Sequence, residues 1–136
     1  MLRSLLPGDS TVVTMRLTGA QLRAMLEQSI ENMFADDPYR RLGGIMQVSG
    51  IVFVYDPAKQ TGSRIVELNA GDDAINPSRE YSVATSSVLA DGGHNCLAFR
   101  DGRDPRRHDE QFQIIADWIR ENKVVRTPAD TRISMV

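Results

Sequence analysis

The sequence predicts an α+β domain in which a mixed β-sheet packs against two main helices, in the order β-α-β-β-β-α-β. Residues Ile51–Tyr55 form a run of β-branched and aromatic side chains, which is typical of a strand. In two other segments, which end near Phe34 and Asn122, apolar residues recur at spacings of three and four, the period of an amphipathic helix. Strands and helices mixed along one chain favour an α+β fold.

Length and composition narrow the class of protein. With 136 residues, the chain is long enough for one domain, residues 1–136, that buries roughly two-thirds of its unfolded surface. A net charge of −2 argues against a nucleic-acid-binding protein. No apolar run approaches the ~20 residues of a membrane span. The only cysteine is Cys96, so an internal disulfide is excluded.

The first strand and helix are expected in the N-terminal quarter of the chain. Residues Thr11–Leu17 have the composition of a strand. Thr18 and Gln21 then form a capping box, which predicts a helix that runs to about Phe34. Its apolar positions are Leu22, Met25, Leu26, Ile30 and Met33, and Glu27 and Glu31 fall on the opposite side. A turn-rich loop, Ala35–Gly44, follows.

A β-hairpin is expected next. The strand Ile51–Tyr55 is apolar enough to be buried on both faces, and Asp56-Pro57 ends it. The polar turn Ala58–Gly62 contains a glycine, so the following strand, Arg64–Leu68, should pair with it in antiparallel orientation.

The second half of the chain adds two strands and a helix. Tyr81–Thr85 is predicted to be a strand, Ser86–Ala90 a short helical turn, and Arg100–His108 a loop of mixed charge. A helix from about Asp109 to Asn122 should bury an apolar face. That face consists of Phe112, Ile115, Trp118 and Ile119. The final residues, Arg132–Val136, are expected to form a closing strand.

The sequence contains no recognisable catalytic motif. It has no H-E-x-x-H, no paired-cysteine motif, no P-loop and no nucleophile elbow. Its two histidines and scattered carboxylates do not have the pattern of a two-metal site. We therefore expect no catalytic residue and no metal ligand in this chain.

Four segments, taken in order, resemble the C-terminal domain of the 5′-nucleotidase family, which includes UDP-sugar hydrolases and 2′,3′-cyclic nucleotide phosphodiesterases. They are Leu17–Asn32, Leu42–Gly62, Tyr81–Asn95 and the closing residues Arg132–Val136. The resemblance covers nearly the whole chain and implies the fold of that domain. It also implies that the chain grips a nucleoside, while a separate N-terminal metallophosphoesterase domain cuts the phosphate ester.

The resemblance implies five substrate-binding positions. The family stacks the base between two aromatic rings, and the residues at those positions here are Ile45 and Val88. The Gly-Gly-Asp stretch of the family is matched by Gly92, Gly93 and His94, so a histidine replaces the aspartate. These three departures remove aromatic stacking, worth roughly 1 kcal/mol beyond burial, and place a donor where the family has an acceptor.

The residues themselves leave other roles open. Ile45 and Val88 have the character of core residues, and Gly92-Gly93 is also typical of a plain turn. His94 is equally compatible with a solvent-exposed loop. A purely structural or interaction module that has lost its ligand is therefore one alternative.

A second alternative comes from the thiosulfohydrolases of sulfur oxidation, which belong to the same superfamily. The segment Glu31–Gly44 resembles their Asp-Pro-Tyr-containing loop ahead of paired glycines. The later segment Ala84–Gly93 is more similar to the nucleotidases, so we place the nucleotidase branch first.

The resemblance also implies what lies outside the chain. The parent protein would be a periplasmic or extracytoplasmic hydrolase with a pair of divalent metal ions, for example Zn or Mn, in its N-terminal domain, and with no cofactor in this chain. The residues Met1–Gly8 match a stretch just after an Asn- and Arg-bearing segment of the family domain, so we expect an N-terminally truncated domain. An exposed strand edge would then favour self-association.

Overall fold

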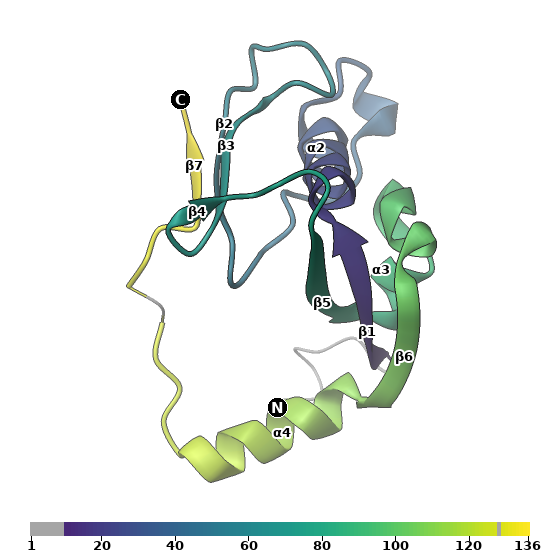
Figure 1. Ribbon diagram of the computed structural model, residues 1–136, viewed down its shortest axis with the longest axis vertical. Coiled ribbons are helices and arrows are strands. Elements are labelled where there is room, and N and C mark those ends of the chain that lie inside the picture. The colour runs from purple at the N-terminus through teal and green to yellow at the C-terminus, as the bar shows by residue number, and fades with distance from the viewer. Residues whose placement is uncertain (1–9, 128) are drawn as a thin grey trace.

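The computed structural model describes residues 10–127 and 129–136, and its helices and strands are shown in Figure 1. The residues Met1–Gly8, on which the expectation of a truncated domain depends, lie outside this part of the chain. The elements in chain order are β1 (Thr11–Thr18), α2 (Gly19–Phe34), η1 (Pro38–Arg40), β2 (Val52–Tyr55), β3 (Ile65–Ala70), β4 (Asp73–Ala74), β5 (Glu80–Ser86), α3 (Ser87–Ala90), η2 (Gly93–Asn95), η3 (Leu97–Asp101), β6 (Arg103–Glu110), α4 (Gln111–Asn122) and β7 (Ile133–Met135).

The predicted α+β class is confirmed, with the described strands divided between two sheets. One sheet has the order β5-β1-β6, and its strands are antiparallel. The other has the order β4-β3-β2-β7 and is mixed, because β7 runs parallel to β2 while β3 runs antiparallel to it. The predicted hairpin of β2 and β3 is confirmed, with Phe53 opposite Leu68.

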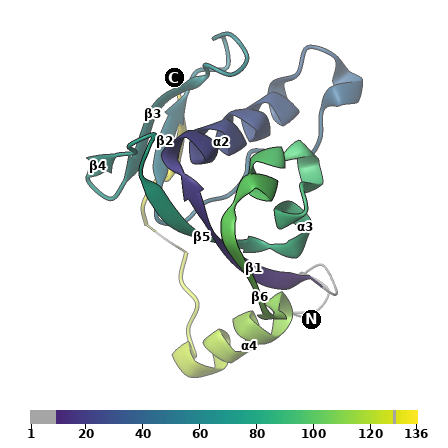
Figure 2. The ribbon, with the colours of Figure 1, turned by 45° about the vertical axis from the view of Figure 1, so that its right-hand side comes forward.

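Helix α2 links the two sheets through a common core. The predicted capping box is present: the Thr18 hydroxyl accepts from the Gln21 amide, and the Gln21 side chain accepts from the Thr18 amide. The core contains residues of β1, α2, β2 and β3 together with Cys96 and Phe99 (the buried members are Val13, Met15, Leu17, Leu22, Met25, Leu26, Ile30, Phe53, Tyr55, Ile65, Leu68, Cys96 and Phe99). Figure 2 shows α2 passing beside both sheets.

Two predictions about buried faces were wrong in part. Strand β2 buries Phe53 and Tyr55, but Val52 is 36% exposed, so only one face of this strand is covered. Met33 of α2 is 43% exposed and lines the large groove described below. Glu27, expected on the outer side of the helix, is buried.

The segment predicted as a mixed-charge loop, Arg100–His108, contains part of a strand. Residues Arg103–Glu110 form β6, which pairs with β1 in antiparallel orientation. All eight residues of β6 are exposed, so no apolar alternation marks this strand in the sequence. Its charges and Pro105 are typical of an edge strand, whose outer side stays free of other chains.

Helix α4 is present near its predicted bounds, but its predicted burial was wrong. Only Ala116 is buried, and Trp118 is 50% exposed. The side chains of Phe112, Ile115 and Ile119 are half-buried. Figures 1 and 2 show the reason: α4 follows the edge strand β6 and stands apart from α2 and the core. Over the described residues, no helix combines the length and apolar character needed to cross a membrane.

Candidate functional site

The candidate site lies where the loop before β2 meets the turn after α3. We call residues Val88–Asn95 the glycine turn and residues Leu42–Ile45 the facing loop. The facing loop begins ten residues from Asn32, whose backbone oxygen accepts a hydrogen bond from the Leu42 amide at 2.9 Å. The glycine turn begins within the short helix α3, which directly follows β5. Both segments therefore extend from elements that belong to the folded body.

Backbone geometry explains the two glycines of the turn. Gly92 has a φ of +89°, and a Cβ there would come within 2.5 Å of Arg100 Nε. A Cβ at Gly93 would lie 2.6 Å from the Val88 carbonyl oxygen and 2.8 Å from Val88 Cγ1. Neither position has space for a side chain unless its neighbour moves. Both glycines are therefore required by the backbone of the turn. The absence of a side chain at Gly93 also leaves room for Val88.

His94 and Asn95 hold an unusual backbone conformation. Their φ angles are +54° and +59°, in the left-handed region that residues other than glycine seldom adopt. Such strain is found more often at functional positions than elsewhere. The turn is closed by a hydrogen bond from the Cys96 amide to the Gly93 carbonyl oxygen at 3.1 Å. The His94 side chain is exposed at this turn.

In the facing loop, Gly43 lies beside His94 of the glycine turn. Gly43 has a φ of +69°, and a Cβ at Gly43 would lie 3.4 Å from His94 Nδ1. The imidazole ring therefore lies close to the Gly43 backbone. Four of the five predicted positions, Val88, Gly92, Gly93 and His94, lie together in the glycine turn, and the facing loop, which contains Ile45, reaches them at Gly43.

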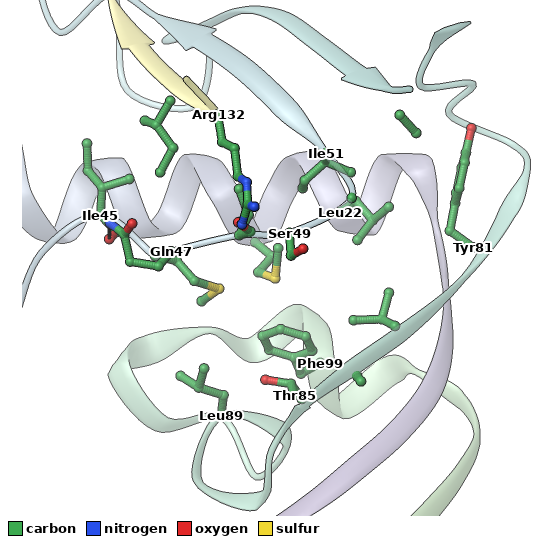
Figure 3. A pocket seen from close by; sticks show the side chains of 18 of the residues that line it. Leu22, Ile45, Gln47, Ser49, Ile51, Tyr81, Thr85, Leu89, Phe99 and Arg132 are labelled. Atoms are coloured by element: carbon green, nitrogen blue, oxygen red, sulfur yellow. Dashed lines mark hydrogen bonds between the residues drawn. The ribbon is translucent and has the colours of Figure 1, made fainter. Parts of the chain in front are cut away.

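Ile45 itself belongs to the wall of a large groove. Figure 3 shows Ile45 and Gln47 along one wall and Leu89 of α3 across from them. The groove has a volume of about 1240 Å³ and runs between residues 44–51, strand β5 and the C-terminal tail. Val88 is 52% exposed and is not among the lining residues. The structure places Ile45 half-buried against the core, on the wall of the groove.

The groove is mainly apolar, with one paired cation. Arg132 donates to the Val48 carbonyl oxygen at 3.1 Å and to the Asp130 carboxylate at 2.9 Å. Figure 3 shows its side chain reaching into the groove near Ser49. The hydrogen bond from Arg132 holds the pKa of the Asp130 carboxyl below its ordinary value. Asp130 therefore stays ionised and neutralises the arginine.

The described residues do not assemble a metal centre or a reactive nucleophile. No group of three or more His, Cys, Asp or Glu side chains in residues 10–127 and 129–136 has the geometry to hold a metal ion. Burial raises the pKa of the Cys96 thiol, so this side chain is neutral at physiological pH.

Sequence reasoning missed Arg132 and Asn32 in this region, and for Gly43 it indicated only that the backbone could adopt positive φ or approach closely. Each of these residues makes a contact that is distant in sequence. Gly43 lies beside His94, 51 residues away, and Asn32 donates to the His94 carbonyl oxygen, 62 residues away. Arg132 donates to the Val48 carbonyl oxygen, 84 residues away. The paired glycines at positions 43 and 44 were a signal for close backbone approach. No local signal marked Arg132, and Asn32 occupies an ordinary polar position in a helix.

The fold and the site define an α+β domain with a large surface groove and, over its described part, no metal cluster. The family model for the 5′-nucleotidase C-terminal domain matches residues 2–101. The chain therefore belongs to the 5′-nucleotidase C-terminal domain family.

Relatives and solved structures agree with this assignment. The chain is 34% identical over 104 residues to an apyrase of Aedes albopictus, covering 70% of the chain and 18% of that protein. A 5′-nucleotidase precursor from Thermus thermophilus has a TM-score of 0.83 at 24% identity, covering 99% of the chain and 27% of that structure. The sulfate thiohydrolase SoxB of the same organism has a TM-score of 0.75 at 27% identity, covering 93% and 22%.

The relatives are much longer than this chain. The chain spans between 18% and 34% of the length of the curated relatives described as apyrases and 5′-nucleotidases. Most of each of those proteins therefore has no counterpart among these 136 residues.

Proposed function

We propose that this chain is the substrate-binding domain of a 5′-nucleotidase-family phosphohydrolase that acts on phosphate esters of nucleotides. In this proposal an N-terminal metallophosphoesterase domain of the same parent protein carries a pair of divalent metal ions, for example Zn or Mn, and the activated water. The parent protein would work in the periplasm or another extracytoplasmic space. Names of the relatives, apyrase and 5′-nucleotidase, support the class of reaction.

One observation carries the binding role. The glycine turn and the facing loop, which are 51 residues apart at Gly43 and His94, meet at the surface, and the Gly43 backbone approaches the imidazole. The exposed His94, held beside the Gly43 backbone, offers its ring to a polar ligand. The adjacent apolar groove offers a surface on which a flat base can rest.

Calorimetric titration of the chain with adenosine, AMP and UDP-glucose tests this role. We expect weak but measurable heat with at least one of them, because Ile45 and Val88 provide apolar contact without aromatic stacking. The same titration on a protein that also contains the metallophosphoesterase domain is the second arm. Absence of heat with all three ligands in both arms would reject the nucleoside role.

Restoring the two rings is the sharper test. Ile45→Phe and Val88→Phe should each raise the affinity for AMP by about fivefold, the equivalent of about 1 kcal/mol of stacking. Val66→Phe is the matched control, because Val66 is an exposed valine on β3 outside the groove lining. Equal affinities for all three variants would favour a module that keeps the fold and has lost the ligand.

A second candidate is a sulfur-oxidation enzyme related to SoxB, supported by the 27% identity to that structure and by the Asp-Pro-Tyr loop. In the structure, Tyr39 of this loop is 96% exposed, so the loop presents its side chains outward. Titration with thiosulfate beside AMP separates the two candidates. Heat with thiosulfate and none with AMP would favour the second.

A further inference from the structure

Asn32 is a buried polar residue in the last turn of α2 that contacts both halves of the candidate site. It is 3% exposed. An amide buried in a helix is costly unless its polar atoms find partners. Here the Asn32 side chain donates to the His94 carbonyl oxygen at 2.6 Å and accepts from Gln28 Nε2 at 3.0 Å. Both polar ends of the amide are therefore used.

The Asn32 backbone reaches the other half of the site. Carbonyl groups in the last turn of a helix have no partner within the helix. The Asn32 carbonyl oxygen accepts instead from the Leu42 amide, the first residue of the facing loop, at 2.9 Å. Asn32 thus hydrogen-bonds to the facing loop through its backbone carbonyl and to the glycine turn through its side-chain amide.

The hydrogen bond from Asn32 falls where two consecutive residues other than glycine have positive φ. His94 and Asn95 are consecutive residues with positive φ, a conformation that costs of order 1 kcal/mol or more per residue. The hydrogen bond from Asn32 to the His94 carbonyl oxygen stabilises this conformation, which directs the imidazole toward Gly43. The position of the ring relative to the facing loop therefore depends on the Asn32 amide.

We propose that Asn32 is a positioning residue, which sets the spacing between His94 and Gly43 and thereby the shape of the ligand site. The part of this inference that concerns ligand affinity rests on the proposed function. The part that concerns the spacing of the two segments depends on the structure alone and is tested without a ligand.

The central variant is Asn32→Asp in the 136-residue chain. It keeps the size of the side chain but replaces the donor to the His94 carbonyl oxygen by an acceptor. We expect shifts of the Gly43 amide resonance and of the His94 ring resonances in NMR spectra. The ring of His108 on β6, which hydrogen-bonds to Thr14 on β1, is the internal reference and should stay in place.

Ser29→Ala is the matched control. Ser29 is also buried in α2, at 2% exposure, and its hydroxyl donates to the Leu26 carbonyl oxygen at 2.9 Å, away from the site. This variant should lower the melting temperature while leaving the Gly43 and His94 resonances unchanged. If Asn32→Asp does not fold, Gln28→Met replaces it, because it leaves Asn32 in place but removes the Gln28 amide that donates to it, and it should shift the same resonances by less.

Affinity for AMP gives the second measurement. Asn32→Asp should weaken it by about tenfold, as expected when a buried hydrogen bond becomes a repulsion, whereas Ser29→Ala should leave it within about twofold. If adenosine, AMP and UDP-glucose give no heat in either arm of the titration, the proposed function fails and the resonances alone decide about Asn32. Unchanged Gly43 and His94 resonances in the Asn32 or Gln28 variant, or equal shifts in Ser29→Ala, would overturn the positioning role.

Discussion

Glu27 is a charged residue that acts as a backbone partner in the interior. Its two carboxylate oxygens accept from the amides of Arg64 and Ile65, at 3.0 and 2.7 Å. Arg64 directly precedes β3 and Ile65 is its first residue, so the Glu27 side chain joins the middle of α2 to the start of that strand. The ion pair between Arg64 and Glu31, at 2.7 Å, lies beside it. Helical periodicity predicted Glu27 on the outer side because the periodicity of apolar residues carries no information about a buried carboxylate that binds backbone amides.

Removal of this carboxylate should destabilise the fold. We expect Glu27→Leu to lower the free energy of unfolding by about 1–3 kcal/mol, because two buried amides lose their acceptors. Urea unfolding followed by circular dichroism measures the change. Glu67→Leu, at an exposed position of β3, is the control and should change the stability by less than about 0.5 kcal/mol. Equal effects of the two variants would show that Glu27 contributes no buried hydrogen bonds.

At the scale of elements, helix α4 depends on local contacts more than on packing. It buries only Ala116, and polar side chains on its surface interact with one another. The Asp117 carboxylate accepts hydrogen bonds from Gln113 and Arg120, one turn away on either side. Pairs at these spacings support an exposed helix by a few tenths of a kcal/mol each.

These contacts predict how Asp117 titrates. The hydrogen bond from Gln113, and then Arg120, hold the pKa of the Asp117 carboxyl below its ordinary value of 3.8. Because the pKa of Asp117 is lower in the folded state, the contribution of its carboxylate to folding stability is complete above pH 3.8. It is lost as the pH falls through the folded pKa. NMR titration of the carboxyl carbon should show a midpoint below 3.8 that rises in Gln113→Ala. The midpoint of Asp130, lowered by Arg132, should not move.

The two outer strands of the β5-β1-β6 sheet differ in how their edges are protected. Strand β6 carries charges and Pro105, and it lies at one end of the sheet. Strand β5 lies at the other end, and five of its residues line the groove. In the part of the chain that the structure describes, its outer side has no neighbouring strand, and its only charged residue is Glu80.

At the scale of the whole molecule, this edge predicts self-association. A free edge with a single charged residue is a template for another strand, so the molecular mass from light scattering should rise with protein concentration. Ser82→Lys, at an exposed position in β5, should suppress the rise by placing a charge at the edge. Ser63→Lys, at an exposed position before β3, is the control and should leave the rise in place. A constant monomer mass over the whole concentration range would contradict the prediction.

Several features of this protein could be predicted from its sequence because they depend on neighbours along the chain. The capping box of Thr18 and Gln21 needs residues three apart, and the β2–β3 hairpin needs a turn between two short strands. The glycine turn was recognised from a short motif, and the resemblance to the 5′-nucleotidase family came from four such segments. Each of these signals lies within a window of about twenty residues, where periodicity and propensity act.

Other features were decided only by the tertiary structure. The burial of Glu27, the exposure of α4, the pairing of the charged strand β6 with β1, and the approach of Gly43 to His94 all join segments far apart in sequence. Such contacts depend on how the sheets are ordered and where each helix comes to lie on them. Periodicity shows that a face is apolar, but the neighbours that cover it are determined by the packing of the whole chain.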